Sequence, residues 1–173
     1  METPELTAAL ARFDSLPPVE ARRLRGEWRG SGVPTGHPLD GLLELYGWWG
    51  KRFDGPDDVH PLVFQDGRGR FSVDPTGLPL SLLGAGALHD PRLAALGRRA
   101  LRLRRTRKPR ARLRMMTYRG VATATMSYDT LPINDHFRAV DDDTLLGVMD
   151  ARGLPPFVFT LHRPNDPGNC VSR

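Results

Sequence analysis

The sequence predicts a mainly β protein, an antiparallel β-barrel with a few short helices, on three observations. Five strand-like segments separated by turns follow one another between residues 111 and 163. The 18 Gly and 16 Pro are spread along the chain, which favours many short elements joined by turns. Residues 26–32 read Gly-x-Trp-x-Gly-x-Gly, in which the glycines permit a sharp bend or a close backbone approach and the indole fills space in a small barrel. We expect one domain over residues 1–173, with 13–64 and 111–163 both contributing to the barrel.

Short helices and one hairpin are predicted in the first hundred residues. Leu10 and Phe13 have helical spacing in the first helix, and Asp40 is a good N-cap for the third. The pair Asp66-Gly67 is typical of a hairpin turn, and Asp90-Pro91 precedes a further short helix. The predicted helices cover residues 4–13, 19–24, 41–52 and 92–99, and the hairpin strands cover 59–65 and 70–73.

The C-terminal strands give the clearest pattern, because turn residues separate them at regular intervals. In the third of these strands, alternation sends Ile133, Asp135 and Phe137 to one face and His136 and Arg138 to the other. The five predicted strands cover residues 111–118, 121–128, 133–140, 144–150 and 157–163.

The basic charge of the chain is concentrated in one segment. The net charge is +5 and the isoelectric point about 10.1, yet residues 98–119 contain many arginines, one lysine and no acid. Residues 98–114 are therefore a candidate for binding nucleic acid through phosphate contacts. The segment lacks interleaved aromatic residues for base stacking, and its alternation of Arg and Leu over 101–104 and 112–114 also suits a strand with one solvated face. We favour the solvated face.

Several classes of protein are not supported by the sequence. One cysteine, Cys170, cannot form a disulfide scaffold, and neither a signal peptide nor a membrane-spanning stretch is recognisable, so we expect a cytoplasmic protein with no membrane partner. No nucleophile elbow, phosphate loop or dinucleotide fingerprint is present. The five histidines are scattered without paired spacing, so no metal site is expected. The sequence leaves open whether the chain forms a homodimer.

Two segments together resemble a known family. The first is residues 13–64 around Gly-Glu-Trp-Arg-Gly, and the second is residues 128–150, which include Leu-Pro-Ile-Asn-Asp-His-Phe-Arg and Thr-Leu-Leu-Gly-Val-Met-Asp. In this order they resemble a bacterial family of uncharacterised proteins named for its Gly-x-Trp-x-Gly domain, which a C-terminal domain of unknown function follows. The resemblance leaves out residues 74–110. It implies a lipocalin-like barrel and provides no catalytic assignment.

The longer motif, Gly-x-Trp-x-Gly-x-Gly, is also similar to that of nitrobindins, which are haem-binding barrels with a late histidine ligand. The rest of the chain departs from that family. Here the late histidine is His162, and alternation places it with Val158 and Thr160, away from Phe157 and Phe159. If the phenylalanines line the interior, His162 points outside, so haem is a minor alternative and no cofactor is expected.

The candidate ligand contacts are one tryptophan in the motif and a group of residues on the C-terminal strands. If Ile133 and Phe137 face a cavity, Asp135 does too, and a buried carboxylate there needs a partner. Asp135 and His136 are the candidates for catalytic residues. The competing interpretations are that the motif tryptophan only plugs the barrel, that Asp135 forms a structural bond to Arg or Tyr, and that His136 lies on the surface. The candidate ligand contacts are Trp28, Tyr118, Tyr128, Asp135, Phe137, Arg138 and Met149.

These residues lead to a functional hypothesis with one main alternative. The preferred hypothesis is a small-molecule-binding protein that holds a mostly apolar ligand in the barrel. The alternative is an enzyme of the isomerase or cyclase type, which acts on an apolar substrate in the same cavity with Asp135 as the acid or base. Haem binding and nucleic-acid binding are the lesser alternatives.

Overall fold

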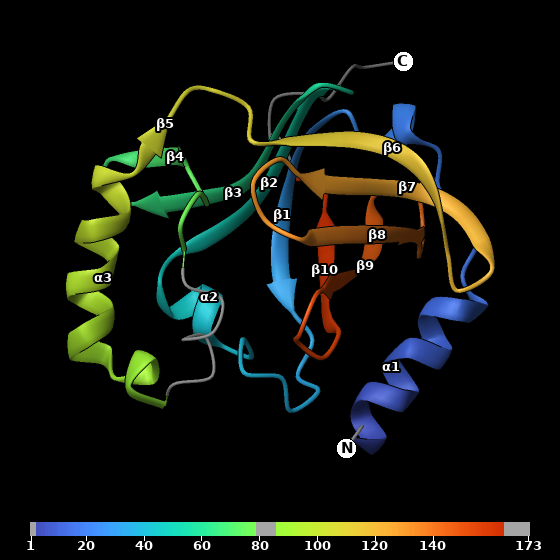
Figure 1. Cartoon of the computed structure of the whole chain (residues 1–173), viewed down its shortest axis with the longest axis horizontal. Coiled ribbons are helices and arrows are strands. Elements are labelled where there is room, and N and C mark those ends of the chain that lie inside the picture. The colour runs from blue at the N-terminus through green and yellow to red at the C-terminus, as the bar shows by residue number, and fades with distance from the viewer. Residues whose placement is uncertain (1–2, 79–85, 165–173) are drawn as a thin grey trace, which may run out of the picture.

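The computed structural model describes residues 3–78 and 86–164, and its strands form a closed antiparallel barrel (Figure 1). The ring contains eight strands in the order β1-β10-β9-β8-β7-β6-β3-β2, and the pairing of β2 with β3 closes it. Beyond the ring, β4 pairs with β3 and β5 pairs with β4. The predicted fold class is therefore confirmed.

The strand bounds agree closely with those predicted for the C-terminal half. The segments β6 and β7 start and end at the predicted residues, and the other three differ by one residue. The strands are β1 (Gly26–Gly32), β2 (Trp48–Gly55), β3 (Asp58–Asp66), β4 (Gly69–Val73), β5 (Arg105–Thr106), β6 (Ala111–Tyr118), β7 (Val121–Tyr128), β8 (Ile133–Ala139), β9 (Thr144–Ala151) and β10 (Phe157–His162).

The two longer helices lie on opposite sides of the barrel (Figure 1). Thr3 caps α1 (Pro4–Ser15), whose Leu6, Leu10 and Phe13 pack on the outer surface of β9 and β10. Asp90 caps α3 (Pro91–Leu103), which presents several leucines to solvent; Leu103 is 90% exposed. The remaining helices are single turns: η1 (Ala21–Leu24), α2 (Leu42–Leu45) and η3 (Gly86–His89).

The helix predicted over 41–52 is wrong. Only α2 is helical, and residues from Trp48 onward form β2. Gly47 adopts a positive φ of 85°, which ends the helical turn, and the following residues pair with both β1 and β3. The strand predicted from the alternation of Arg and Leu is wrong for residues 101–104, because α3 continues to Leu103. It is confirmed for residues 112–114, which lie in β6 with both arginines exposed and Leu113 buried.

The glycines of the motif and of its neighbouring strand permit close packing. Gly30 faces the barrel interior, where a Cβ atom would overlap the edge of the Trp48 indole. A Cβ on Gly50 of β2, which has a φ of 153°, would overlap the carbonyl oxygen of Trp28. The motif therefore sets the close packing of β1 against β2, as the sequence predicts from its glycines.

The barrel interior has a dense apolar layer near one end. Trp28, Phe53 and Phe137 are buried there, and the Phe53 and Phe137 rings meet edge to face with centroids 6.0 Å apart. The Trp28 indole N–H donates to the carbonyl of Leu24 in η1, at 2.8 Å. This layer closes the end of the barrel nearest η1. The opposite end, nearest α2, is less densely filled and contains a cavity.

Candidate functional site

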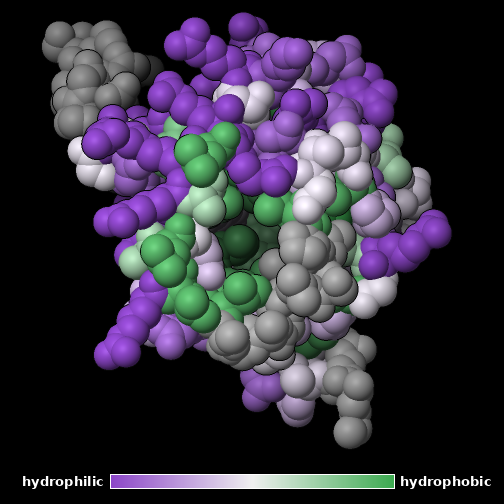
Figure 2. Space-filling view, turned by 60° about the vertical axis from the view of Figure 1, so that its left-hand side comes forward, coloured by the Kyte–Doolittle hydropathy of each residue, from purple (hydrophilic) through white to green (hydrophobic). Residues whose placement is uncertain are grey.

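An apolar cavity of about 100 Å³ occupies the barrel end nearest α2. The face shown in Figure 2 has a hollow rimmed by hydrophobic residues, consistent with such a cavity. Strand ends and the loops beside them supply the walls, because inward-facing side chains alternate along each strand. The described lining residues are Leu39, Leu43, Trp48, Lys51, Leu62, Leu78, Tyr128, Leu131, Ile133, Asp135, Met149, Phe157 and Phe159.

Two charged side chains stand on this apolar wall. The Lys51 ammonium Nζ lies 2.7 Å from Asp135 Oδ2, and the two side chains are only 3% and 2% exposed. Among the described lining residues they alone carry a formal charge. A buried ion pair loses much hydration energy and is retained only when its geometry compensates, so its position in a cavity makes it a candidate functional group.

A bulge between β2 and β3 holds Lys51 in place. The register shifts between the pairs Gly50–Val63 and Arg52–His60. Pro61, opposite this irregularity, has no N–H for the sheet, and its carbonyl accepts a second hydrogen bond from Lys51 Nζ at 3.2 Å. The bulge thus supplies a backbone acceptor that fixes the ammonium against Asp135.

Three aromatic rings surround the ammonium. Nζ of Lys51 lies 5.0 Å from the centroid of Phe159, 5.8 Å from that of Trp48 and 5.9 Å from that of Tyr128. The negative faces of such rings stabilise a cation in a site that excludes water. The pair is thereby embedded in an environment of low polarity.

The other carboxylate oxygen of Asp135 is incompletely satisfied. Oδ1 is buried, and no described residue donates a hydrogen bond to it. Burial raises the pKa of Asp135, and the Lys51 ammonium opposes this rise. Burial, with the Asp135 charge nearby, also raises the pKa of Tyr128 well above its usual value, so the phenol stays protonated at neutral pH.

The structure brings together three of the seven predicted ligand contacts. Tyr128, Asp135 and Met149 line the cavity. Trp28 and Phe137 lie in the apolar layer beneath it, and the Trp28 ring also stacks under the Arg163 guanidinium at 4.3 Å.

The remaining candidates lie on the outer surface of the barrel, because alternation along β6 and β8 turns them outward. His136 is buried there, stacked on Tyr118 with centroids 3.9 Å apart, and burial lowers its pKa to about 4. Arg138 lies over the Phe13 ring of α1, at 5.2 Å, and donates to the carbonyl of Leu16. His136 therefore cannot reach the cavity, and Asp135 is left as the acid or base of the enzyme hypothesis.

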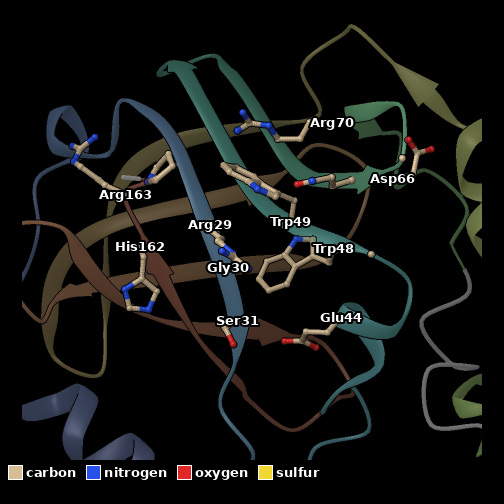
Figure 3. Close-up of a pocket in the computed structure, with 14 residues that line it drawn as sticks. Arg29, Gly30, Ser31, Glu44, Trp48, Trp49, Asp66, Arg70, His162 and Arg163 are labelled. Atoms are coloured by element: carbon tan, nitrogen blue, oxygen red, sulfur yellow. The ribbon is translucent and has the colours of Figure 1, made fainter. Parts of the chain in front are cut away.

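A second, polar depression lies outside the barrel over β1, β2 and β10 (Figure 3). The Arg70 guanidinium stacks on Trp49 at 4.4 Å and pairs with Glu27, and His162 contacts the hydroxyls of Thr144 and Thr160. His162 thus lies outside, as its strand alternation predicts. The depression is broad and open, so it encloses a small molecule less well than the barrel cavity does.

Part of the basic segment is engaged in ion pairs on the surface. Four of its arginines each pair with an aspartate elsewhere in the chain: Arg102 with Asp66, Arg110 with Asp74, Arg112 with Asp129 and Arg114 with Asp57. Such pairing agrees with a solvated face.

One group of potential metal ligands occurs in the described part of the chain. Asp54, Asp58 and His60 place their ligand atoms within 4.8 Å of one another at the β2–β3 turn. The Arg52 guanidinium already binds Asp54 at 2.8 Å, and its positive charge opposes a cation there. This cluster is therefore a weaker candidate than the cavity.

Comparison with known proteins identifies the family. A family model described as "GXWXG protein" matches residues 11–69, and one described as "Domain of unknown function (DUF4334)" matches residues 109–163. A solved structure of a protein from Thermomonospora curvata is 32% identical, with a TM-score of 0.69, over 93% of this chain and 88% of that chain. The chain belongs to the GXWXG family. No curated protein matches it.

Within this GXWXG protein, sequence reasoning missed Lys51. The residue lies in the segment predicted as a helix, so the sequence alone did not place it on an inward face of the barrel. Lys51 is one of only two lysines in a chain with 25 Lys and Arg, and a lone lysine in an arginine-rich sequence was a signal that could have singled it out. Cys170 lies outside the described residues, and no helix among those described has the length and apolar character needed to cross a membrane.

Proposed function

We propose that this protein binds a small, mostly apolar molecule in the barrel cavity, with the polar end of the ligand at the Lys51–Asp135 pair. One observation carries the proposal: an apolar cavity contains a single buried ion pair, and one oxygen of its carboxylate has no hydrogen-bond partner among the described residues. Cavities with apolar walls and a few convergent polar groups are typical small-molecule sites.

The size of the cavity limits the ligand. An apolar cavity of roughly 150 Å³ in another protein binds benzene, so a space of about 100 Å³ suits a compact molecule with no more than one small ring. Porphyrins are several times larger than that, and His162 lies outside the barrel. The geometry therefore favours a compact ligand over haem.

Methyl resonances of the protein's own methionines provide a test. Met149 lines the cavity, whereas Met115 and Met116 are exposed on β6. We expect methylcyclohexane to shift the Met149 methyl resonance in a saturable manner and to leave those of Met115 and Met116 unchanged.

A cavity-filling variant is the matched control. Ile133→Phe should abolish the Met149 response because it fills the cavity, whereas Leu96→Phe on the exposed face of α3 should not. No saturable shift with any compact apolar probe would overturn the proposal.

An acid–base enzyme in the same cavity is the second candidate. It is favoured by Asp135, whose raised pKa and incompletely bonded carboxylate suit proton transfer at a substrate held against it. Chemical analysis of compounds recovered after incubation separates the candidates. Recovery of unchanged compound supports a binding protein. An isomerised product supports the enzyme if Asp135→Asn, shown to be folded by circular dichroism, fails to form it.

A further inference from the structure

We propose that the cavity selects a neutral hydroxyl compound, a compact alcohol, over a ketone, a carboxylate or an amine of the same size. This inference rests on the proposed binding function and names the chemical class of the ligand. It follows from the charge of the pair and from the hydrogen-bond positions that the pair leaves open.

The charge of the site argues for a neutral ligand. The Lys51 ammonium and the Asp135 carboxylate neutralise each other at 2.7 Å, and no other described lining residue carries a formal charge. A ligand carboxylate would add an uncompensated negative charge beside Asp135, and a ligand ammonium would compete with Lys51. Either ligand ion would move from water into an apolar cavity, which is unfavourable unless an unpaired opposite charge is present to bind it.

The open hydrogen-bond positions argue for a group that both donates and accepts. Asp135 Oδ1 accepts nothing from any described residue. Lys51 has three N–H donors, of which one bonds Asp135 Oδ2 and one bonds the carbonyl of Pro61. A hydroxyl can donate to the carboxylate and accept from the ammonium, whereas a ketone can only accept and leaves the carboxylate oxygen unsatisfied.

The Tyr128 phenol adds a further donor to the site. It lines the cavity beside Asp135, and its raised pKa keeps it protonated, so it offers the ligand oxygen a neutral donor and no further charge. A hydroxyl bound among Tyr128, Lys51 and Asp135 would therefore complete a short network in which each polar group has a partner.

A panel of small cyclic compounds tests the inference with the protein as it is. The probes are cyclohexanol, cyclohexanone, cyclohexylammonium, cyclopentanecarboxylate and methylcyclohexane, which are close to one another in size. Dissociation constants come from titration of the Met149 methyl resonance. We expect cyclohexanol to bind at least about tenfold tighter than cyclohexanone, since a hydrogen bond to a charged group is at stake, and the two ions to bind more weakly still.

A double variant isolates the role of the pair. Lys51→Met with Asp135→Leu replaces both charges by apolar side chains of similar size, which a folded protein tolerates better than the loss of one partner. We expect this variant to bind methylcyclohexane and to lose the preference for cyclohexanol over cyclohexanone. Tyr128→Phe, which removes one donor and no charge, should weaken the binding of cyclohexanol and cyclohexanone alike and leave the preference in place.

The outcomes separate this inference from the proposed function. If methylcyclohexane and cyclohexanol both fail to shift Met149, the binding function itself is overturned. If they bind but cyclohexanone, cyclopentanecarboxylate or cyclohexylammonium binds as tightly as cyclohexanol, the cavity function stands and the hydroxyl preference is overturned. The five probes on the wild-type protein decide between these outcomes even if the double variant fails to fold.

Discussion

At the scale of single residues, Lys51 and Asp135 form a unit whose members depend on each other. Each is almost completely buried and finds its main polar partner in the other. Taking a charge into an apolar interior is unfavourable unless an opposite charge and hydrogen bonds compensate. Loss of one partner is therefore more damaging than loss of both.

We expect Asp135→Asn to lower the free energy of unfolding by about 3 kcal/mol or more, because it leaves the Lys51 ammonium buried without its counter-charge. The double replacement Lys51→Met with Asp135→Leu should change it far less. Urea denaturation of the wild type and both variants measures the effect. A double variant less stable than Asp135→Asn would contradict this account of the pair.

His136 gives the fold a dependence on pH. Burial lowers its pKa from 6.5 to about 4, so the folded state resists a proton that the unfolded chain accepts. The free energy of unfolding should therefore fall as pH decreases from about 6.5 to about 4, by roughly 3 kcal/mol from this residue.

The variant His136→Asn, whose amide can still bond Thr125, should flatten that dependence. Part of the slope should remain, because burial also lowers the pKa values of His37 and His60. Leu96→Asn at an exposed site of α3 is the matched control, and it should leave the slope unchanged because it removes no titratable group. An unaltered slope in His136→Asn would show that His136 already accepts its proton in the folded protein.

At the scale of elements, the contact between β1 and β2 depends on side-chain volume. Gly30 lies against the Trp48 indole with no room for a methyl group. We expect Gly30→Ala to lower the free energy of unfolding by about 1–3 kcal/mol through overpacking. Gly67→Ala, whose added carbon meets nothing within 4 Å, should change it by no more than about 0.5 kcal/mol.

A double-mutant cycle identifies the cause. In a Trp48→Leu background the ring edge is gone, so Gly30→Ala should be nearly neutral there. Thermal or urea unfolding of the four proteins gives the coupling. An equal loss in both backgrounds would mean that Gly30 is needed for its backbone conformation and not for the space it leaves.

The elements also show where sequence reasoning succeeded and where it failed. The five C-terminal strands alternate regularly and are bounded by turn residues, so the sequence located them to within one residue. Over residues 41–52, by contrast, Leu42, Leu45 and Trp49 happen to have helical spacing, and this local pattern competed with the pairing of β2 with β1 and β3. Tertiary pairing prevailed over the local signal.

At the scale of the whole molecule, the closed barrel and α3 should differ in stability. The barrel strands pair on both sides, whereas Ala94 is the one residue of α3 that is fully buried among the residues described. Amide hydrogen exchange should therefore be much slower in β8 and β9 than in α3. Protection of α3 equal to that of β8 would indicate that its exposed leucines are covered in solution.

The sequence predicted one member of the buried ion pair, Asp135, but not its partner, Lys51. Alternation in β8 was enough to place Asp135 inside and His136 outside. The partner of Asp135 was not predictable, since Lys51 lies 84 residues away and meets it only when the barrel closes. The sequence predicts Tyr118 and Arg138 beside Asp135 because they are near it in sequence or at a strand end, but the faces of their strands turn them away.

The packing of Gly30 against Trp48 has a consequence for how the family can diverge. The Trp48 indole on β2 fills the space that a side chain at position 30 on β1 would occupy, so a larger residue at either position requires a smaller one at the other. Relatives with a larger residue in place of Gly30 should carry a smaller one in place of Trp48, and the two substitutions should be inherited together. The last glycine of the family's five-residue signature, Gly30, is then required by the size of Trp48, an aromatic residue that lies outside the signature.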